Sequence, residues 1–220
     1  MDVKVCGLTC VEDARAAQEM GADCLGFVLH ADSPRGIDPA RMWRILDRLP
    51  GSVRAVAVVV NETRRYVERL MADGPLRAVQ LHGEERGEDL QDLPVALWRA
   101  VRFEMDGRIS PAPADWSVER WVVDAAVPGA RGGTGKTADW AAAAEWARRA
   151  CVMLAGGLTP ENVGAAIRAV APAGVDVASG VEREPGRKDY PRMRAFIRQA
   201  RLAADELERA TMQRQKKGDR

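Results

Sequence analysis

The sequence is poor in the side chains that bind metals. It holds two histidines and four cysteines. The cysteines are scattered, with no Cys-x-x-Cys spacing, at Cys6, Cys10, Cys24 and Cys151. This pattern fits neither a metal-binding cluster nor a disulfide framework, and scattered thiols are typical of a reducing compartment. We therefore expect no metal site and a cytoplasmic location.

The chain also lacks an excess of charge of one sign and a long apolar run. Lys and Arg number 33 against 32 for Asp and Glu, so the composition does not suggest a nucleic-acid partner. No apolar run approaches the roughly 18 residues that span a bilayer. Residues 1–4 lead directly into a strand pattern, without a secretory signal. We expect neither a nucleic acid nor a membrane as a partner.

Short apolar segments are what the sequence has in abundance. Hydrophobic residues make up 46% of the 220 positions, enough for a substantial core. Eight runs of strand character alternate with helix-sized segments, at residues 4–8, 24–29, 53–60, 76–81, 95–103, 121–124, 151–154 and 175–177. This alternation predicts an α/β fold, a single (β/α)₈ TIM barrel over residues 1–207. Residues 208–220 are polar and charged, and we expect them to form a disordered tail.

An open, doubly wound sheet is the alternative architecture. A dinucleotide-binding sheet of that kind carries Gly-x-Gly-x-x-Gly after its first strand. Residues 6–9 read Cys-Gly-Leu-Thr at that point. The barrel is therefore the better prediction.

Several helix starts carry capping signals. Thr9 and Glu12 have the spacing of a capping box. Asp38 precedes a proline that would occupy the first helical position. Asn61 and Thr159 stand where the helices after the third and seventh strands would begin. We expect these side chains to cap the helices that follow them.

A barrel of this type places its active site at the carboxyl ends of the strands. Asp124 ends a strand there and precedes a glycine-rich loop, residues 127–135. An acid under a loop that can move is a common active-site arrangement, although such a carboxylate can also be a simple cap. Residues 130–137 (ARGGTGKT) resemble a P-loop, but Ala130 replaces its first glycine. A nucleotide-binding module is therefore only the alternative function.

Three further strand ends carry side chains able to do chemistry. Cys6 can be a general base, since a free thiol has a pKa of about 8.5, or it can be a core residue. Arg35 follows Ser33 and Pro34, and its planar guanidinium suits a carboxylate; the alternative is a solvated loop arginine. His82 can orient a substrate or make a simple loop hydrogen bond.

Glycines follow the seventh and eighth strands, where barrels of this type commonly bind phosphate. They are Gly156, Gly157 and Gly180, the last preceded by Ser179. Bare backbone N–H groups at helix N-termini bind phosphate well. Tight turns are the other explanation for these glycines.

The motifs form an ordered set over about residues 3–200: 4–9 (KVCGLT), 33–35 (SPR), 79–83 (VQLHG), 132–137 (GGTGKT), 155–158 (AGGL) and 179–182 (SGVE). This set resembles the phosphoribosylanthranilate isomerase family. The resemblance implies a (β/α)₈ barrel of tryptophan biosynthesis that needs no cofactor and acts on a small phosphorylated substrate. Monomers and homodimers both occur in such a family.

The resemblance also implies roles in an Amadori rearrangement of N-(5-phosphoribosyl)anthranilate. Asp124 is then the general acid that protonates the ring oxygen, and Cys6 is the general base that removes the C2 proton. Arg35 holds the anthranilate carboxylate. A bifunctional isomerase that also serves histidine synthesis is the rival in this class. It carries an aspartate at the position of Cys6, which argues against it.

Overall fold

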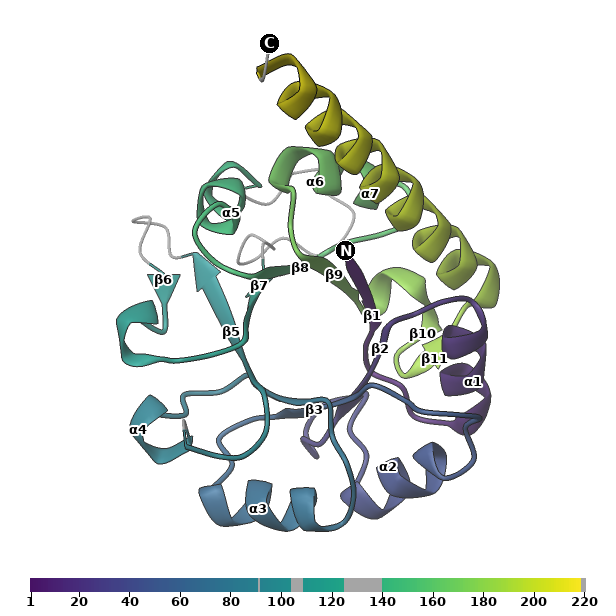
Figure 1. Ribbon diagram of the computed structural model, residues 1–220. Helices are drawn as coiled ribbons and strands as arrows, with labels where there is room; N and C mark the ends of the chain where they lie inside the picture. The colour runs from purple at the N-terminus through teal and green to yellow at the C-terminus, as the bar shows by residue number, and fades with distance from the viewer. Residues whose placement is uncertain (91, 104–108, 125–139, 219–220) are drawn as a thin grey trace.

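The computed structural model describes residues 1–90, 92–103, 109–124 and 140–218. Eight parallel strands pair in the order β4-β3-β2-β1-β9-β8-β7-β5, and β5 pairs back with β4, so the sheet closes. The strands are β1 (Asp2–Val5), β2 (Cys24–Val28), β3 (Ala55–Val59), β4 (Ala78–Leu81), β5 (Leu97–Phe103), β7 (Arg120–Asp124), β8 (Val152–Ala155) and β9 (Gly174–Val177). The predicted (β/α)₈ barrel is confirmed (Figure 1).

Helices surround the barrel on its outer side (Figure 1). They are α1 (Val11–Glu19), α2 (Pro39–Leu46), α3 (Arg64–Ala72), α4 (Gly87–Leu90), α5 (Trp140–Ala147), α6 (Val163–Val170) and α7 (Tyr190–Gly218). Smaller elements are β6 (Ile109–Ser110), the hairpin β10 (Glu182–Glu184) and β11 (Arg187–Lys188), and the 3₁₀ turns η1 (Pro113–Asp115) and η2 (Ser179–Val181). None of the helices within the described residues is both long and apolar enough to cross a membrane.

The strands divide their side chains between two cores, because successive residues of a strand point to opposite faces. Val3 and Val5 of β1 belong to the large core between the sheet and the helices. Trp98, Val56 and Met153 belong to a smaller core inside the barrel. A strand buried on both faces reads as a continuous apolar run, which is why the strand positions could be predicted.

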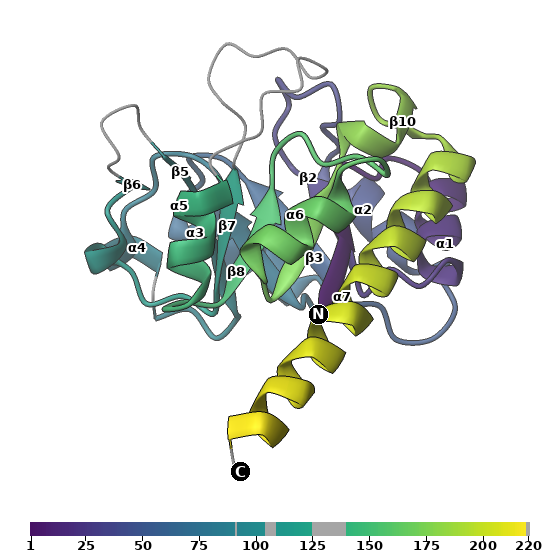
Figure 2. The same cartoon turned by 90° about the horizontal axis from the view of Figure 1, so that it is seen from above.

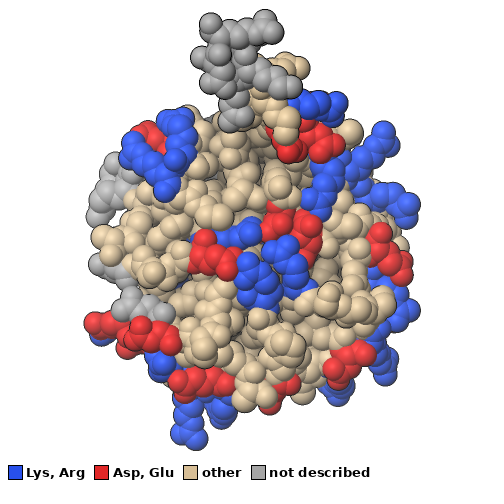
Figure 3. Space-filling view, in the orientation of Figure 1, with Lys and Arg blue, Asp and Glu red and all other residues tan. Residues whose placement is uncertain are grey.

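Ion pairs fill the amino end of the barrel. The carboxylate of Asp2 lies 3.1 Å from Arg54 and 2.7 Å from Arg120. The guanidinium of Arg120 also lies 5.1 Å from the ring centroid of Trp98. Charged side chains of both signs gather over the centre of this end (Figure 3). The carboxyl ends of the strands lie on the opposite side, at the top of Figure 2.

The capping signal in the sequence was correct at α2 and wrong at α1. Asp38 caps α2 by accepting the N–H of Arg41 at 2.7 Å. At α1 the N-cap residue is Cys10, without a side-chain bond, and the hydroxyl of Thr9 donates to the carbonyl of Gly186 at 2.7 Å. The expected capping box is therefore wrong, because a distant carbonyl competes for the Thr9 hydroxyl.

The same correction applies after β3 and β8. Thr63, not Asn61, caps α3, with its hydroxyl accepting a backbone N–H. The amide oxygen of Asn61 instead accepts the N–H of Glu84 at 2.6 Å. Asn162, not Thr159, is the N-cap residue of α6. A loop-to-loop contact therefore occupies Asn61, whereas the Thr159 hydroxyl accepts the N–H of Glu161 at 3.3 Å within its own loop, ahead of the helix.

The last helix is longer than predicted. Met193, Phe196 and Ala200 of α7 are buried, and the helix continues to Gly218 past the end of the barrel (Figures 1 and 2). Residues 208–218 are thus helical, and the expectation of a disordered tail there is wrong. The segment is rich in Glu, Arg, Gln and Lys, which favour helix, and it extends a helix that packing has already nucleated. The domain boundary at Leu207 stays a prediction.

Candidate active site

The closed sheet brings the predicted site residues to one end of the barrel. Cys6 directly follows β1, His82 follows β4, and Asp124 is the last residue of β7. In the register of the sheet, Val5 lies beside Val177, and Asp124 lies beside Ala155. Since β8 and β9 stand between β7 and β1, the two glycine loops separate the predicted acid from the predicted base.

Cys6 is a buried thiol that continues the β1 ladder. Its N–H donates to the carbonyl of Val177 at 2.8 Å, and the residue is only 7% exposed. A Cβ atom at Gly26 would lie 2.7 Å from the Cys6 sulfur and 3.0 Å from Cε of Lys4. Glycine at position 26 therefore makes room for both side chains. Burial raises the pKa of the Cys6 thiol, and the charges of Lys4 and Lys188 oppose that rise.

Asp124 is half-buried at the end of β7, with His82 near enough to feel its charge. Burial lowers the pKa of His82, while the Asp124 carboxylate partly offsets this. The imidazole is therefore neutral at pH 7, and its Nδ1 lies 3.3 Å from the amide nitrogen of Gln80. The glycine-rich loop, its P-loop-like stretch and any motion over Asp124 lie outside the described residues.

Glu85 and Arg99 fix the segment that carries His82. The carboxylate of Glu85 accepts the N–H of Gly83 at 2.9 Å and a guanidinium N–H of Arg99 at 2.7 Å. Both side chains of this ion pair are almost fully buried. Such a charge-assisted network holds its members in one geometry, so His82 is presented on a rigid turn.

Arg35 is engaged by a second carboxylate of the chain. Its Nε and Nη2 both donate to Glu182, at 2.8 Å and 2.6 Å. Burial alone would raise the pKa of Glu182, but the hydrogen bonds from Arg35 and the charge of Lys188 lower it below its ordinary value. The pair is therefore ionised at neutral pH. Because Arg35 has five N–H donors, this contact leaves its Nη1 group for a ligand.

The two glycine loops pack against each other. Gly156 and Gly157 have φ values of 84° and 63°, which glycine adopts without strain. A Cβ atom at Gly180 would collide with the carbonyl of Leu158. The side chain of Asn162 donates to the carbonyl of Gly157 at 3.0 Å. Within the described residues, the N–H groups of Gly157, Ser179 and Gly180 have no partner, so they are available to an anion.

Comparison with known proteins identifies the family of this chain. The family model for N-(5'phosphoribosyl)anthranilate (PRA) isomerase matches residues 3–199. The N-(5'-phosphoribosyl)anthranilate isomerase of Trichlorobacter lovleyi is 44% identical over 202 residues, covering 91% of this chain and 98% of the relative. This chain belongs to the N-(5'-phosphoribosyl)anthranilate isomerase family. The barrel is the fold expected from the sequence, and the roles of the strand-end residues stay predictions.

Solved structures of this family have the same fold. The phosphoribosyl anthranilate isomerase of Thermotoga maritima has a TM-score of 0.80 at 37% identity, covering 91% of this chain and 98% of its own. A second structure holds reduced 1-(o-carboxyphenylamino)-1-deoxyribulose 5-phosphate. It has a TM-score of 0.77 at 34% identity, covering 91% of this chain and 98% of its own.

Sequence reasoning missed Lys188, which connects Cys6 with Glu182, the partner of Arg35, at the candidate site. Its buried ammonium donates to the carbonyls of Cys6 and Ala178 at 2.7 Å and 3.1 Å, and to Glu182 at 2.9 Å. The backbone N–H of Lys188 donates to the carboxylate of Asp13 on α1. No local pattern marks this lysine, because all of its partners are distant in the sequence or lie across a turn.

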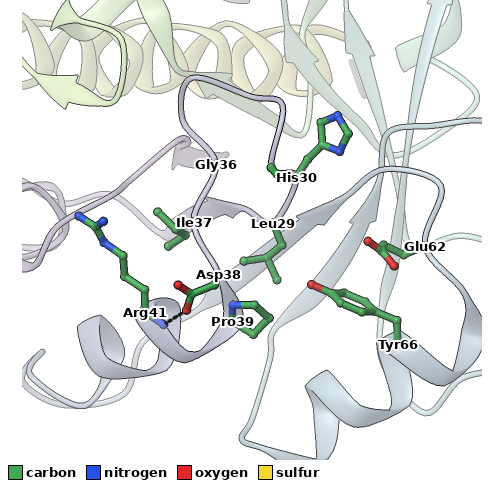
Figure 4. Close-up of a pocket in the computed structure, with 10 residues that line it drawn as sticks. Leu29, His30, Gly36, Ile37, Asp38, Pro39, Arg41, Glu62 and Tyr66 are labelled. Carbon is green, nitrogen blue, oxygen red and sulfur yellow. Dashed lines mark hydrogen bonds between the residues drawn. The ribbon is translucent and has the colours of Figure 1, made fainter.

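A surface pocket of about 570 Å³ lies outside this site. It opens between the loop after β2 and the start of α3, with His30, Glu62 and Tyr66 around it (Figure 4). None of the predicted catalytic, substrate-binding or phosphate-binding residues lines it. Within the described residues, no cluster of His, Cys, Asp or Glu is suited to a metal ion. The barrel mouth therefore remains the candidate site.

Proposed function

We propose that this chain converts N-(5'-phosphoribosyl)anthranilate to 1-(o-carboxyphenylamino)-1-deoxyribulose 5-phosphate, an Amadori rearrangement in tryptophan biosynthesis. Membership of the isomerase family supports this reaction. The observation that carries it is the arrangement of the barrel mouth. Cys6 and Asp124 end strands that are separated by β8 and β9, whose glycine loops present backbone donors. A phosphorylated sugar bound by those loops lies between an acid and a base.

Asp124 acts first, as the general acid. It donates a proton to the furanose ring oxygen, the C1–O bond breaks, and the aryl nitrogen supplies the electrons that form the Schiff base. The charged nitrogen at C1 then acidifies the C–H bond at C2. A positioned acid contributes roughly 10²–10⁴-fold to such a step. His82, neutral and within range of the Asp124 charge, can donate or accept a hydrogen bond at the opening sugar.

Cys6 acts second, as the general base. Its thiolate takes the proton from C2, the C1–C2 double bond forms, and the electron pair neutralises the nitrogen. The resulting enolamine tautomerises to the 2-ketone, with a proton added at C1. Burial raises the pKa of the Cys6 thiol, so the thiolate is less populated than in water but is a stronger base when formed.

Arg35 and the glycine loops bind the two ends of the substrate. The Nη1 group of Arg35 is free of Glu182 and suits the anthranilate carboxylate. Gly156, Gly157, Ser179 and Gly180 bind the phosphate through backbone N–H groups. These contacts hold the substrate in place while the reacting carbons stay between Asp124 and Cys6, which reduces the entropic cost of reaching the transition state.

A cytoplasmic location and a monomer or homodimer complete the proposal. A structure of the Thermotoga maritima relative describes monomers generated from a dimeric enzyme, so both states are compatible with the fold of that relative. The solution mass of this chain, measured by light scattering, decides between them.

Complementation tests the reaction as a whole. A tryptophan auxotroph that lacks this isomerase should grow without tryptophan when it expresses the chain. The variant with Asp124→Asn should not support growth at equal expression. A failure of the wild-type chain to complement, with folded protein present in the cells, contradicts the proposed reaction.

A further inference from the structure

Lys4 is a charged side chain inside the barrel that the proposed reaction does not use. Its ammonium is 0% exposed and lies 3.0 Å from the carboxylate of Asp176, which is 11% exposed. The two residues are register partners on β1 and β9. Removing two charges from water costs several kcal/mol per ion, and apolar residues of similar volume commonly serve stability as well or better. The buried ion pair therefore points to a role for Lys4 beyond packing.

The position of Lys4 points to Cys6. The two residues are two apart on one extended segment, so their side chains share the face that points into the barrel. The sulfur of Cys6 and Cε of Lys4 both border the space above Gly26, at 2.7 Å and 3.0 Å from where its Cβ would be. The end of the Lys4 side chain thus lies near the thiol inside the barrel, where its ammonium is fully buried.

Four charged side chains act on Cys6 from the elements around it. Lys4 comes from β1, Asp176 from β9, Lys188 from β11 and Arg35 from the loop after β2. Lys188 and Arg35 are both bonded to Glu182, so their charges are largely compensated there. Burial alone would lower the pKa of Lys4, but the charges of Asp176 and Cys6 raise it. Lys4 therefore stays a cation across the physiological range.

We propose that Lys4 is a positioning residue for the base: its buried ammonium, held by Asp176, is the countercharge that allows the Cys6 thiol to ionise inside the barrel. The catalytic part of this inference rests on the proposed role of Cys6. The charge coupling between Lys4 and Cys6 does not, because it is a property of the free protein. Asp176 has a double effect, since it orients the ammonium and also weakens its field at the sulfur.

The test measures the pH at which half of the Cys6 thiol is ionised. The rate of alkylation by iodoacetamide, measured from low to high pH, gives this midpoint. Tandem mass spectrometry that assigns the label to a residue separates Cys6 from Cys10, which lies in the same peptide, and from exposed Cys151. Lys4→Met should raise the midpoint by about one to three pH units. Asp176→Asn should lower it, because the cation remains and its compensating carboxylate is gone. Lys4→Arg keeps the cation and should restore the midpoint toward the wild-type value.

Opposite shifts in the two variants cannot arise from a general loosening of the barrel. Circular dichroism checks that each variant is folded, and Asp176→Asn alone still tests the coupling if Lys4→Met does not fold. An unchanged midpoint in folded Lys4→Met overturns the proposal. Shifts of the same sign in both variants overturn it as well.

The pH profile of kcat/KM separates this inference from the proposed function. If Cys6 is the base, the alkaline shift of its midpoint in Lys4→Met should appear as an equal shift in the basic limb of the profile. A shifted thiol midpoint with an unshifted profile would support the charge coupling and overturn the assignment of Cys6 as the base. A non-functional wild-type chain would leave the alkylation result valid.

Discussion

The ammonium of Lys188 lies 2.7 Å from the carbonyl oxygen of Cys6, which joins the hairpin after β9 to the end of β1. The same ammonium also binds Ala178 and Glu182. One buried cation therefore connects the predicted base, the predicted phosphate loop after β9 and the carboxylate that holds Arg35. The geometry of the site depends on contacts between the two ends of the chain.

Lys188→Met should damage both stability and activity. It leaves the Glu182 carboxylate with one partner fewer in a buried place, and breaking a buried pair costs roughly 3–5 kcal/mol. Urea unfolding should show this loss, and kcat should fall because the Cys6 backbone is no longer fixed. Arg183→Met is the matched control on the same hairpin, where the side chain is exposed. Equal small effects of the two changes would contradict the role of Lys188.

Asp124→Asn and Cys6→Ser should each lower kcat by roughly 10²–10⁴-fold, with little change in KM. Asparagine has no proton to transfer to the ring oxygen, and a serine hydroxyl is not ionised at neutral pH. We expect Asp124→Asn to be the more damaging change, because ring opening comes first. Steady-state kinetics checks both. Near wild-type turnover by the Asp124→Asn enzyme would show that another group is the acid.

Gly157→Ala should raise KM through the phosphate site. The added Cβ meets no protein atom within 4 Å, so its effect falls on the ligand and on the backbone, whose φ is 63°. Gly51→Ala is a matched control, with φ 68° and the same open surroundings, but it lies away from the barrel mouth. Both should lose about 1 kcal/mol of stability, and only the first should raise KM.

Ser179→Ala removes one hydroxyl and leaves the backbone donor, so its effect on KM should be smaller than that of Gly157→Ala. If neither change at the mouth alters KM, the phosphate binds elsewhere.

Acid stability should depend on Glu182. Its pKa is lowered from 4.5 in the folded protein, so its ionised form contributes stability that is complete above pH 4.5. That contribution is lost as pH falls below 4.5 through the lower folded-state pKa. The difference in unfolding free energy between wild type and Glu182→Gln should therefore be largest near neutral pH and shrink in acid. A constant difference from about pH 7 to pH 3 would contradict this linkage.

ATP should not raise the thermal midpoint of unfolding. The P-loop-like residues 130–137 lack the first glycine of the motif, and the proposed anion site instead uses the loops after β8 and β9. Inorganic phosphate should raise the midpoint, since a ligand that binds only the folded state stabilises it. Stabilisation by ATP well beyond that by phosphate at equal concentration would favour the nucleotide-binding alternative.

The sequence by itself determined the barrel and the strand ends at which we propose its site. Runs such as residues 24–29 and 55–60 are apolar throughout, and a parallel strand buried on both faces has this local signature. Barrels of this type have their active sites at the carboxyl ends of the strands. This rule selected Cys6, Asp124 and the glycine loops as candidates. These inferences need only local periodicity and chain order.

Only the tertiary structure decided which polar groups pair. Lys4 stands between two valines and Asp176 between two more, which hints at an ion pair, but the closure of β1 on β9 is what brings them together. Thr9 and Asn61 have capping chemistry, yet they bind Gly186 and Glu84. A hydrogen bond depends on atoms within about 3 Å, and register and loop packing set those distances between residues far apart in the chain.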